Sequence, residues 1–234
     1  MSREMKAILC YLAYDLRFSL KVFWSILFTT VLAIFFIALS FDDTVINYST
    51  GAAIYIFCAI SGFLLTKETF PYCVKLGTTR STYVIGALLF NVLLAFFMSF
   101  IHVLTLILFR GLIKLTNTEN VSIFLTIENA TFLSTMSEQL LMDTVICFLL
   151  ISIGFLLSSI FYRLGLVGGF TGVTIIGLII ILPWAREWVI ETLFNIATHS
   201  FSLNYLSFLL LGLIAIIPTW LLLRNASTTP GVTR

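Results

Sequence analysis

Six uninterrupted apolar stretches constrain this chain more than any other feature of its sequence. They occupy residues 22–41, 46–65, 83–109, 139–161, 166–184 and 205–223. A helix needs about 20 mostly apolar residues to cross the hydrocarbon core of a bilayer. Inside that core each backbone polar group must find its partner within the protein. We therefore expect an all-α integral membrane protein with six transmembrane helices, organised as a single transmembrane domain over residues 1–234.

The amino-acid composition excludes the classes of water-soluble protein. Hydrophobic residues make up 60% of the 234 residues and charged residues only 10%, against roughly 25% charged residues in soluble domains. The net charge of +2 does not predict a nucleic-acid partner. Cys10, Cys58, Cys73 and Cys147 show no metal-ligand spacing, and we expect reduced thiols that pack as small apolar residues.

The distribution of Lys and Arg predicts which side of the membrane each loop faces. If the N-terminus lies in the cytosol, ten basic residues fall on the inner side and three, Arg110, Lys114 and Arg186, on the outer side. Cytoplasmic loops carry the excess of basic residues in membrane proteins. We therefore expect a multi-pass protein of the plasma membrane with its N- and C-termini in the cytosol.

Several segments outside the spans have patterns of their own. Residues 1–21 place apolar side chains at helical spacing among charged ones, which is typical of a cytosolic interfacial helix. The alternative is that they extend the first span. Weak alternation over 121–127 favours a short strand or lid within the outer segment 110–138. Residues 185–203 predict an outer interfacial or re-entrant helix, and residues 224–234 a disordered cytosolic tail.

The sequence shows no catalytic or metal-binding motif. It lacks G-x-x-x-x-G-K-[ST], H-E-x-x-H and G-x-S-x-G, so we expect no enzyme activity, metal or cofactor in this chain itself. The clear ionisable residue inside the spans is His102, with Asn91 on the same span. Two roles for His102 are considered: a hydrogen-bonded packing role and a place in a translocation path. Asp143, one turn inside the fourth span, is expected at the level of the lipid headgroups.

Small residues open the fifth predicted span. Gly165, Gly168, Gly169 and Gly172 form two overlapping G-x-x-x-G spacings. Such residues let helix backbones approach closely in lipid, where van der Waals contact is the main attraction. This face is therefore predicted to pack against another helix, either within the chain or in a second subunit.

A polar and aromatic segment, residues 67–83, separates the second and third spans. Its sequence is K-E-T-F-P-Y-C-V-K-L-G-T-T-R-S-T-Y. Thr69 suits the N-cap of a short helix and Gly77 suits its left-handed stop. Thr78 or Thr79 would then cap the third span. The charge distribution places this helix in the cytosol, and we call residues 67–83 the docking segment.

The docking segment is predicted to bind a partner protein. Its helix would display aromatic and aliphatic side chains beside cations, a composition found at protein interfaces. The candidate docking residues are Lys67, Glu68, Phe70, Pro71, Tyr72, Val74, Lys75, Leu76, Gly77 and Arg80. The alternative is a plain loop whose aromatic residues lie back on the lipid interface.

Residues 67–86 resemble the permease subunits of type-2 ABC exporters, in particular the small permeases of Gram-positive bacteria. Those permeases often carry K-E-x-F-P and then L-G-x-T-R-x-x-Y between their second and third spans. The chain has K-E-T-F-P and L-G-T-T-R-S-T-Y at this place. The order of spans and helices matches over nearly the whole chain. The long outer segment 110–138 departs from the pattern, because many relatives have a short loop there.

The resemblance implies a half-transporter. Two permease subunits, identical or related, would pair and bind two separate ABC ATPase subunits, which would hold ATP and Mg²⁺. A cytosolic coupling helix between spans two and three would convey closure of the ATPase to the spans. The cargo would be a hydrophobic or amphipathic peptide, antibiotic or lipid-like molecule, moved out of the cell. The alternative function is a membrane-embedded assembly or sensor protein that binds a cytosolic partner without transport.

Overall fold

The computed structural model describes residues 3–40, 46–116, 121–123, 132–184, 186–187 and 203–226. Most of this part is helical, in α1 (Arg3–Ser40), α2 (Gly51–Leu64), α4 (Arg80–Thr116), α5 (Phe132–Ile181) and α7 (Leu203–Arg224). A π-helical turn, η1 (Leu65–Thr69), joins α2 to the short helix α3 (Phe70–Lys75). Two strands, β1 (Ile46–Tyr48) and β2 (Val121–Ile123), pair in parallel.

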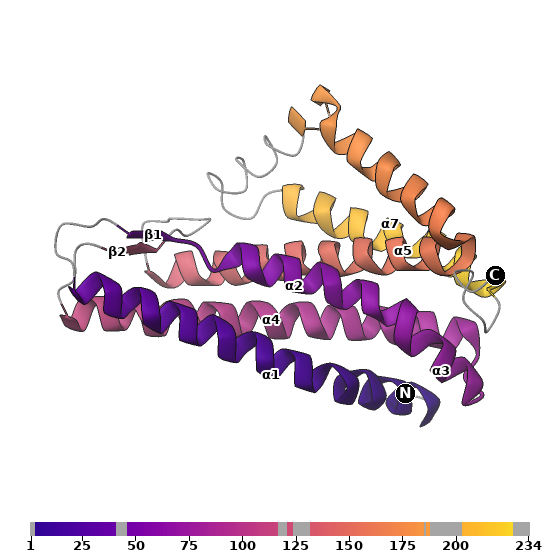
Figure 1. Cartoon of the computed structure of the whole chain (residues 1–234), viewed down its shortest axis with the longest axis horizontal. Helices are drawn as coiled ribbons and strands as arrows, with labels where there is room; N and C mark the ends of the chain where they lie inside the picture. Colours follow the sequence, from indigo (N-terminus) through magenta and orange to yellow (C-terminus); the bar gives the residue numbers. More distant parts are fainter. Residues whose placement is uncertain are drawn as a thin grey trace.

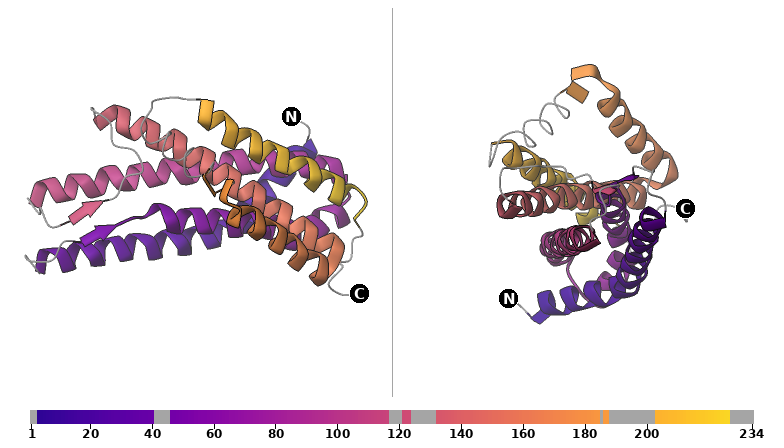
Figure 2. Two further views of the ribbon diagram at one scale, coloured as in Figure 1. Left: turned by 90° about the horizontal axis from the view of Figure 1, so that it is seen from above. Right: turned by 90° about the vertical axis from the view of Figure 1, so that its left-hand side faces the viewer.

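The helices form an elongated bundle with two distinct ends (Figures 1 and 2). α5 contacts α2, α4 and α7, and α1 packs along α4. One end carries α3 together with the start of α1, the start of α4 and the end of α7, and we call it the α3 end. The opposite end carries β1 and β2, and we call it the strand end. The helices α1 and α4 run between these two ends.

Five helices in the described part are long and apolar enough to cross a membrane. Their outer faces carry exposed apolar side chains such as Phe18, Phe36, Leu93 and Val167. Apolar side chains of this number and size need a hydrocarbon surrounding, which a bilayer supplies. The chain is a multi-pass α-helical membrane protein, as its composition predicts.

The N-terminal segment is continuous with the first span. α1 runs without interruption for 38 residues, because residues 3–40 contain neither Gly nor Pro. Ile8 and Leu12 belong to the same buried core as Trp24 and Val31, farther along the helix. The structure therefore shows no break between residues 3–21 and the first span, and the interfacial position expected for residues 1–21 stays a prediction.

The fourth and fifth predicted spans form two arms of α5, which meet at Gly165. This residue has φ 72° and ψ −166°, a conformation that glycine alone adopts without steric strain. In Figure 1 the second arm, drawn in orange, turns back from the α3 end and diverges from the rest of the bundle. The glycine thus lets one long helical segment reverse direction without a loop.

The other three glycines of the two G-x-x-x-G spacings pack within the chain. A Cβ atom added to Gly169 would lie 2.0 Å from the ring of Phe161, and one added to Gly168 would lie 2.1 Å from Cβ of Leu164. Gly172 faces Ile160, with 3.3 Å between that added Cβ and the side chain. The small residues therefore let the second arm of α5 approach the end of the first arm.

The outer segments are described only in part. β2 covers the start of the strand expected at 121–127, while the rest of that strand lies outside the described residues. α4 continues to Thr116, beyond the predicted end of the third span. The expected outer helix at 185–203 and the tail at 224–234 lie almost entirely outside the described residues.

α2 and the first arm of α5 make backbone contact through two glycines. A Cβ atom on Gly62 of α2 would lie 2.1 Å from the carbonyl oxygen of Ile151, and one on Gly154 of α5 would lie 2.2 Å from that of Ala59. Each helix thus contributes one glycine and one facing carbonyl to the contact. Because the obstacle is backbone on both sides, no side-chain rotation could make room for a methyl group.

Substituting Gly62 by Ala is expected to destabilise the protein. The added methyl group overlaps the Ile151 carbonyl, and overpacking of this kind costs about 1–3 kcal/mol. Gly111→Ala is the matched control, because a Cβ at Gly111 meets nothing within 4 Å. That control should gain up to about 1 kcal/mol from helix propensity. Unfolding in mixed detergent micelles measures both, and equal stabilities for the two variants would contradict the close contact.

Candidate functional site

The docking segment begins as a continuation of α2. Thr69 has helical angles, φ −91° and ψ −33°, and its side chain makes no capping hydrogen bond. Its hydroxyl donates instead to the carbonyl of Leu65, one turn earlier, and lies 2.6 Å from the Tyr83 hydroxyl. The predicted N-cap at Thr69 is therefore wrong, because these buried partners occupy the side chain that would have capped α3.

The end of α3 matches the prediction. Gly77 has φ 94°, its N–H donates to Val74 over 3.0 Å, and Thr78 N–H donates to Cys73 over 3.1 Å. This pair of bonds is the Schellman motif that ends helices at a left-handed glycine. Thr79 then caps α4 by accepting a hydrogen bond of 3.2 Å from the backbone N–H of Thr82. Hydrogen bonds therefore close both the end of α3 and the start of α4.

Six of the ten candidate docking residues are exposed at the α3 end: Lys67, Glu68, Tyr72, Lys75, Leu76 and Gly77. Leu76 is 68% exposed and Tyr72 is 47% exposed. Pro71 and Val74 are half-buried. The Tyr72 ring stacks on Tyr11 of α1 with 4.9 Å between centroids. The exposed residues form an apolar and cationic surface next to the start of α1.

Phe70 does not lie on this surface. It is 1% exposed, and its ring makes edge contacts with Tyr83 of α4 and Tyr162 of α5, each with 5.3 Å between centroids. The expectation that Phe70 is displayed is therefore wrong. The π-helical turn before α3 directs this side chain toward α4 and α5, where it anchors the docking segment to both helices.

Arg80 is engaged within the chain. Its guanidinium donates a hydrogen bond of 2.8 Å to the carbonyl of Arg224 at the end of α7. Arg163 of α5 donates to the neighbouring carbonyl of Leu221 over 3.1 Å. Cations favour the C-terminal end of a helix, where carbonyls lack partners within the helix. Arg80 therefore links the docking segment to α7, so half-buried Arg80 contributes less to the exposed surface than predicted.

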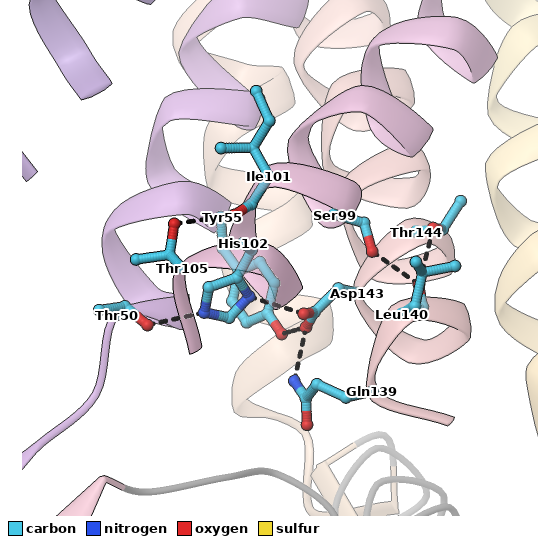
Figure 3. Close-up of polar contacts among 10 residues, drawn as sticks. All are labelled: Thr50, Tyr55, Ser99, Ile101, His102, Thr105, Gln139, Leu140, Asp143 and Thr144. Carbon is cyan, nitrogen blue, oxygen red and sulfur yellow. Dashed lines mark hydrogen bonds and ion pairs between the residues drawn. The ribbon is translucent and has the colours of Figure 1, made fainter. Parts of the chain in front are cut away.

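A buried polar cluster lies near the strand end, between α2, α4 and α5 (Figure 3). His102 Nδ1 is 2.6 Å from Oδ2 of Asp143, and His102 Nε2 is 2.6 Å from the hydroxyl of Thr50. The other oxygen of Asp143 accepts hydrogen bonds of 2.6 Å from Tyr55 and 3.0 Å from Gln139. One carboxylate thus connects the three helices.

The cluster has the order of a hydroxyl–imidazole–carboxylate relay, but its burial indicates a structural role. Asp143 is 0% exposed, and both Thr50 and His102 are buried. A nucleophile in acyl transfer must reach a carbonyl group of its substrate, and the Thr50 hydroxyl is enclosed by the protein. Buried polar groups are tolerated where they are hydrogen-bonded, as here. We interpret the cluster as a polar cross-link that holds α2, α4 and α5 together.

Sequence reasoning found His102 but not its partner. The hydrogen-bonded packing role expected for His102 agrees with its contacts. Asp143 is buried inside the bundle, and its expected depth at the level of the lipid headgroups stays a prediction. The two residues are 41 positions apart, so no local motif joins them. Each residue lies a few positions from the predicted outer end of its span, and this similar depth could have predicted that the two side chains meet. Among the described residues no group of three His, Cys, Asp or Glu could hold a metal ion.

Replacing Asp143 by Ala is expected to destabilise the bundle. The change removes the acceptor shared by His102, Tyr55 and Gln139, and each buried donor without a partner costs about 1–3 kcal/mol. Thr144→Ala is the matched control, because its hydroxyl bonds only to Leu140 within its own helix. Thermal unfolding in detergent should place Asp143→Ala well below Thr144→Ala. Similar midpoints would refute the cross-link.

Comparison with known proteins leaves the family open. A scan against protein-family models matches none of them. Searches of curated proteins and of solved structures give no significant match either. The chain is therefore described by its own geometry, as a multi-pass helical membrane protein with an exposed surface at the α3 end and a buried polar cluster near the strand end.

Proposed function

We propose that the chain is the membrane subunit of an ATP-driven exporter of the type-2 ABC class. A separate ATPase binds the docking segment at the α3 end, and the cargo is a hydrophobic or amphipathic molecule. The observation that carries this proposal is the exposed surface formed by Tyr72, Lys75 and Leu76 on a short helix with a hydrogen-bonded end. Apolar side chains beside cations are suited to protein contact.

The charge distribution supports a cytosolic position for the α3 end. This end carries Lys67 and Lys75 in the docking segment, Arg163 at the turn of α5 and Arg224 at the end of α7. Basic residues concentrate on the cytoplasmic side of membrane proteins. With the two arms of α5 taken as separate spans, the chain crosses the membrane six times and both termini lie on the cytosolic side.

The contacts of α3 suit it to convey movement. Phe70 packs on α4 and α5 through Tyr83 and Tyr162, and Tyr72 stacks on α1 through Tyr11. α3 is also continuous with α2 through the π-helical turn. A force applied to its exposed face would therefore act on four helices at once. Packed interiors respond to such shifts by switching between discrete arrangements.

Leu76→Asp and Lys75→Glu are expected to abolish stimulation of the partner ATPase by this chain. Leu76→Asp places a negative charge in the centre of the exposed apolar surface. Lys75→Glu replaces a positive charge at the edge of that surface by a negative one. Both side chains are exposed, so the membrane fold should survive. Phe70→Asp is unsuited to this purpose, because a buried charge would disturb the core. ATP hydrolysis and cargo export are measured with the two proteins in vesicles.

The strand end provides matched controls for this experiment. Leu115 is 82% exposed and Lys114 is exposed beside it on α4, so Leu115→Asp and Lys114→Glu repeat the same chemical changes far from the docking segment. Full activity is expected from both. Unchanged ATPase stimulation in Leu76→Asp and Lys75→Glu would contradict the docking role. Purification from native membranes with a partner that is not an ATPase would favour the assembly or sensor function.

A further inference from the structure

We propose that an anionic phospholipid binds in a groove between α1 and α4 near the α3 end. The groove has a volume of about 430 Å³, within the range of small-molecule sites. Leu9, Ala13 and Leu20 of α1 line one wall, and Phe90, Leu93 and Phe97 of α4 line the other. The lining is almost entirely apolar, and the groove opens on the outside of the bundle, so an acyl chain is the natural occupant.

A row of cations borders this groove. Lys6, Arg17 and Lys21 are all exposed, and they share one face of α1 with Cys10 and Ala13 of the groove wall. The spacings along the row are four, three, four and four residues, which place the side chains above one another on a helix. Along α1, Lys6 precedes the apolar residues that line the groove and Lys21 follows them, while Arg17 lies beside them.

Acidic residues lie on a different face of α1. Glu4, Tyr11 and Asp15 recur at intervals of seven and four residues, and Glu4 and Tyr11 line a second hollow beside Cys73 and Leu76 at the end of α3. α4 has no acidic residue along its side of the lipid groove, and none anywhere between Arg80 and Arg110. The positive charge beside the groove is therefore not neutralised by neighbouring carboxylates.

An amphiphile with a negatively charged headgroup matches both features. Its acyl chain would fill the apolar groove, and its phosphate would accept hydrogen bonds from Lys21 and from Arg17, whose guanidinium carbon lies 3.7 Å from the centroid of the Tyr14 ring. Basic residues near a membrane surface attract anionic lipids by about 1 kcal/mol each. A neutral lipid would gain the apolar contact without the charge, so the site should discriminate between headgroups. This inference requires only that the chain spans a bilayer and is independent of an ATPase partner.

Native mass spectrometry of the full chain in detergent tests the charge requirement. The protein is titrated with dioleoyl phosphatidylglycerol, and separately with dioleoyl phosphatidylcholine as the neutral lipid. The triple variant K6Q/R17Q/K21Q should lose affinity for phosphatidylglycerol by on the order of 100-fold. The control K67Q/K75Q/K114Q removes the same charge from exposed positions elsewhere and should bind as the wild type does. Equal losses in the two triple variants would overturn the proposal.

A second pair of variants tests the groove itself. Ala13→Phe fills the groove and keeps every cation, so it should weaken phosphatidylglycerol binding at least tenfold. Ala33→Phe adds the same ring at an exposed position of α1 outside the groove and should have no effect. Unfolding midpoints in neutral detergent confirm that both variants fold.

The remaining outcomes also decide between sources of binding. Undiminished binding to Ala13→Phe would show attraction to the charged surface alone and would overturn the groove site. Inorganic phosphate added in excess should not displace the lipid. Displacement by phosphate would identify the ligand as a free anion and would overturn the proposal of a lipid.

Discussion

The backbone contact between α2 and α5 is the interaction on which the rest of the structure depends. Gly62 and Gly154 bring the two helix axes close enough for carbonyl oxygens to fill the space of a side chain. In lipid, where apolar burial no longer drives association, such close packing is a main source of attraction between helices. The contact fixes the relative height of α2 and α5, and with it the meeting of Tyr55 with Asp143 toward the strand end.

The two ends of the bundle use polar groups differently. Toward the strand end one carboxylate accepts hydrogen bonds from side chains of α2, α4 and its own helix α5, and these bonds cross-link the three helices. At the α3 end the polar groups close helix termini, as Arg80 does for α7 and Thr79 for α4. These polar side chains bond to the helix ends and do not cover the outer face of α3. Tyr72 and Leu76 on that face therefore stay exposed.

Much of the fold could be predicted from the sequence, because apolar length and turn chemistry are local properties. The long apolar helices, the stop at Gly77 and the cap at Thr79 follow from such patterns. The burial of Phe70 and the pairing of His102 with Asp143 do not, since each depends on helices far apart in the chain. The continuity of α1 could have been predicted, because residues 3–40 contain neither Gly nor Pro. The charged residues near its start instead suggested a boundary.

The π-helical turn η1 has a consequence for the register of the docking segment. In this turn the N–H of Phe70 bonds to the carbonyl of Leu65, five residues earlier, so it contains one residue more than an α-helical turn. Each residue of an α-helix advances the side-chain direction by about 100°. The extra residue therefore rotates the side chains of α3 about the helix axis relative to those of α2. A chain shortened by one residue here would turn the face bearing Leu76 by about a quarter of a revolution, although α2 and α3 would still read as one helix.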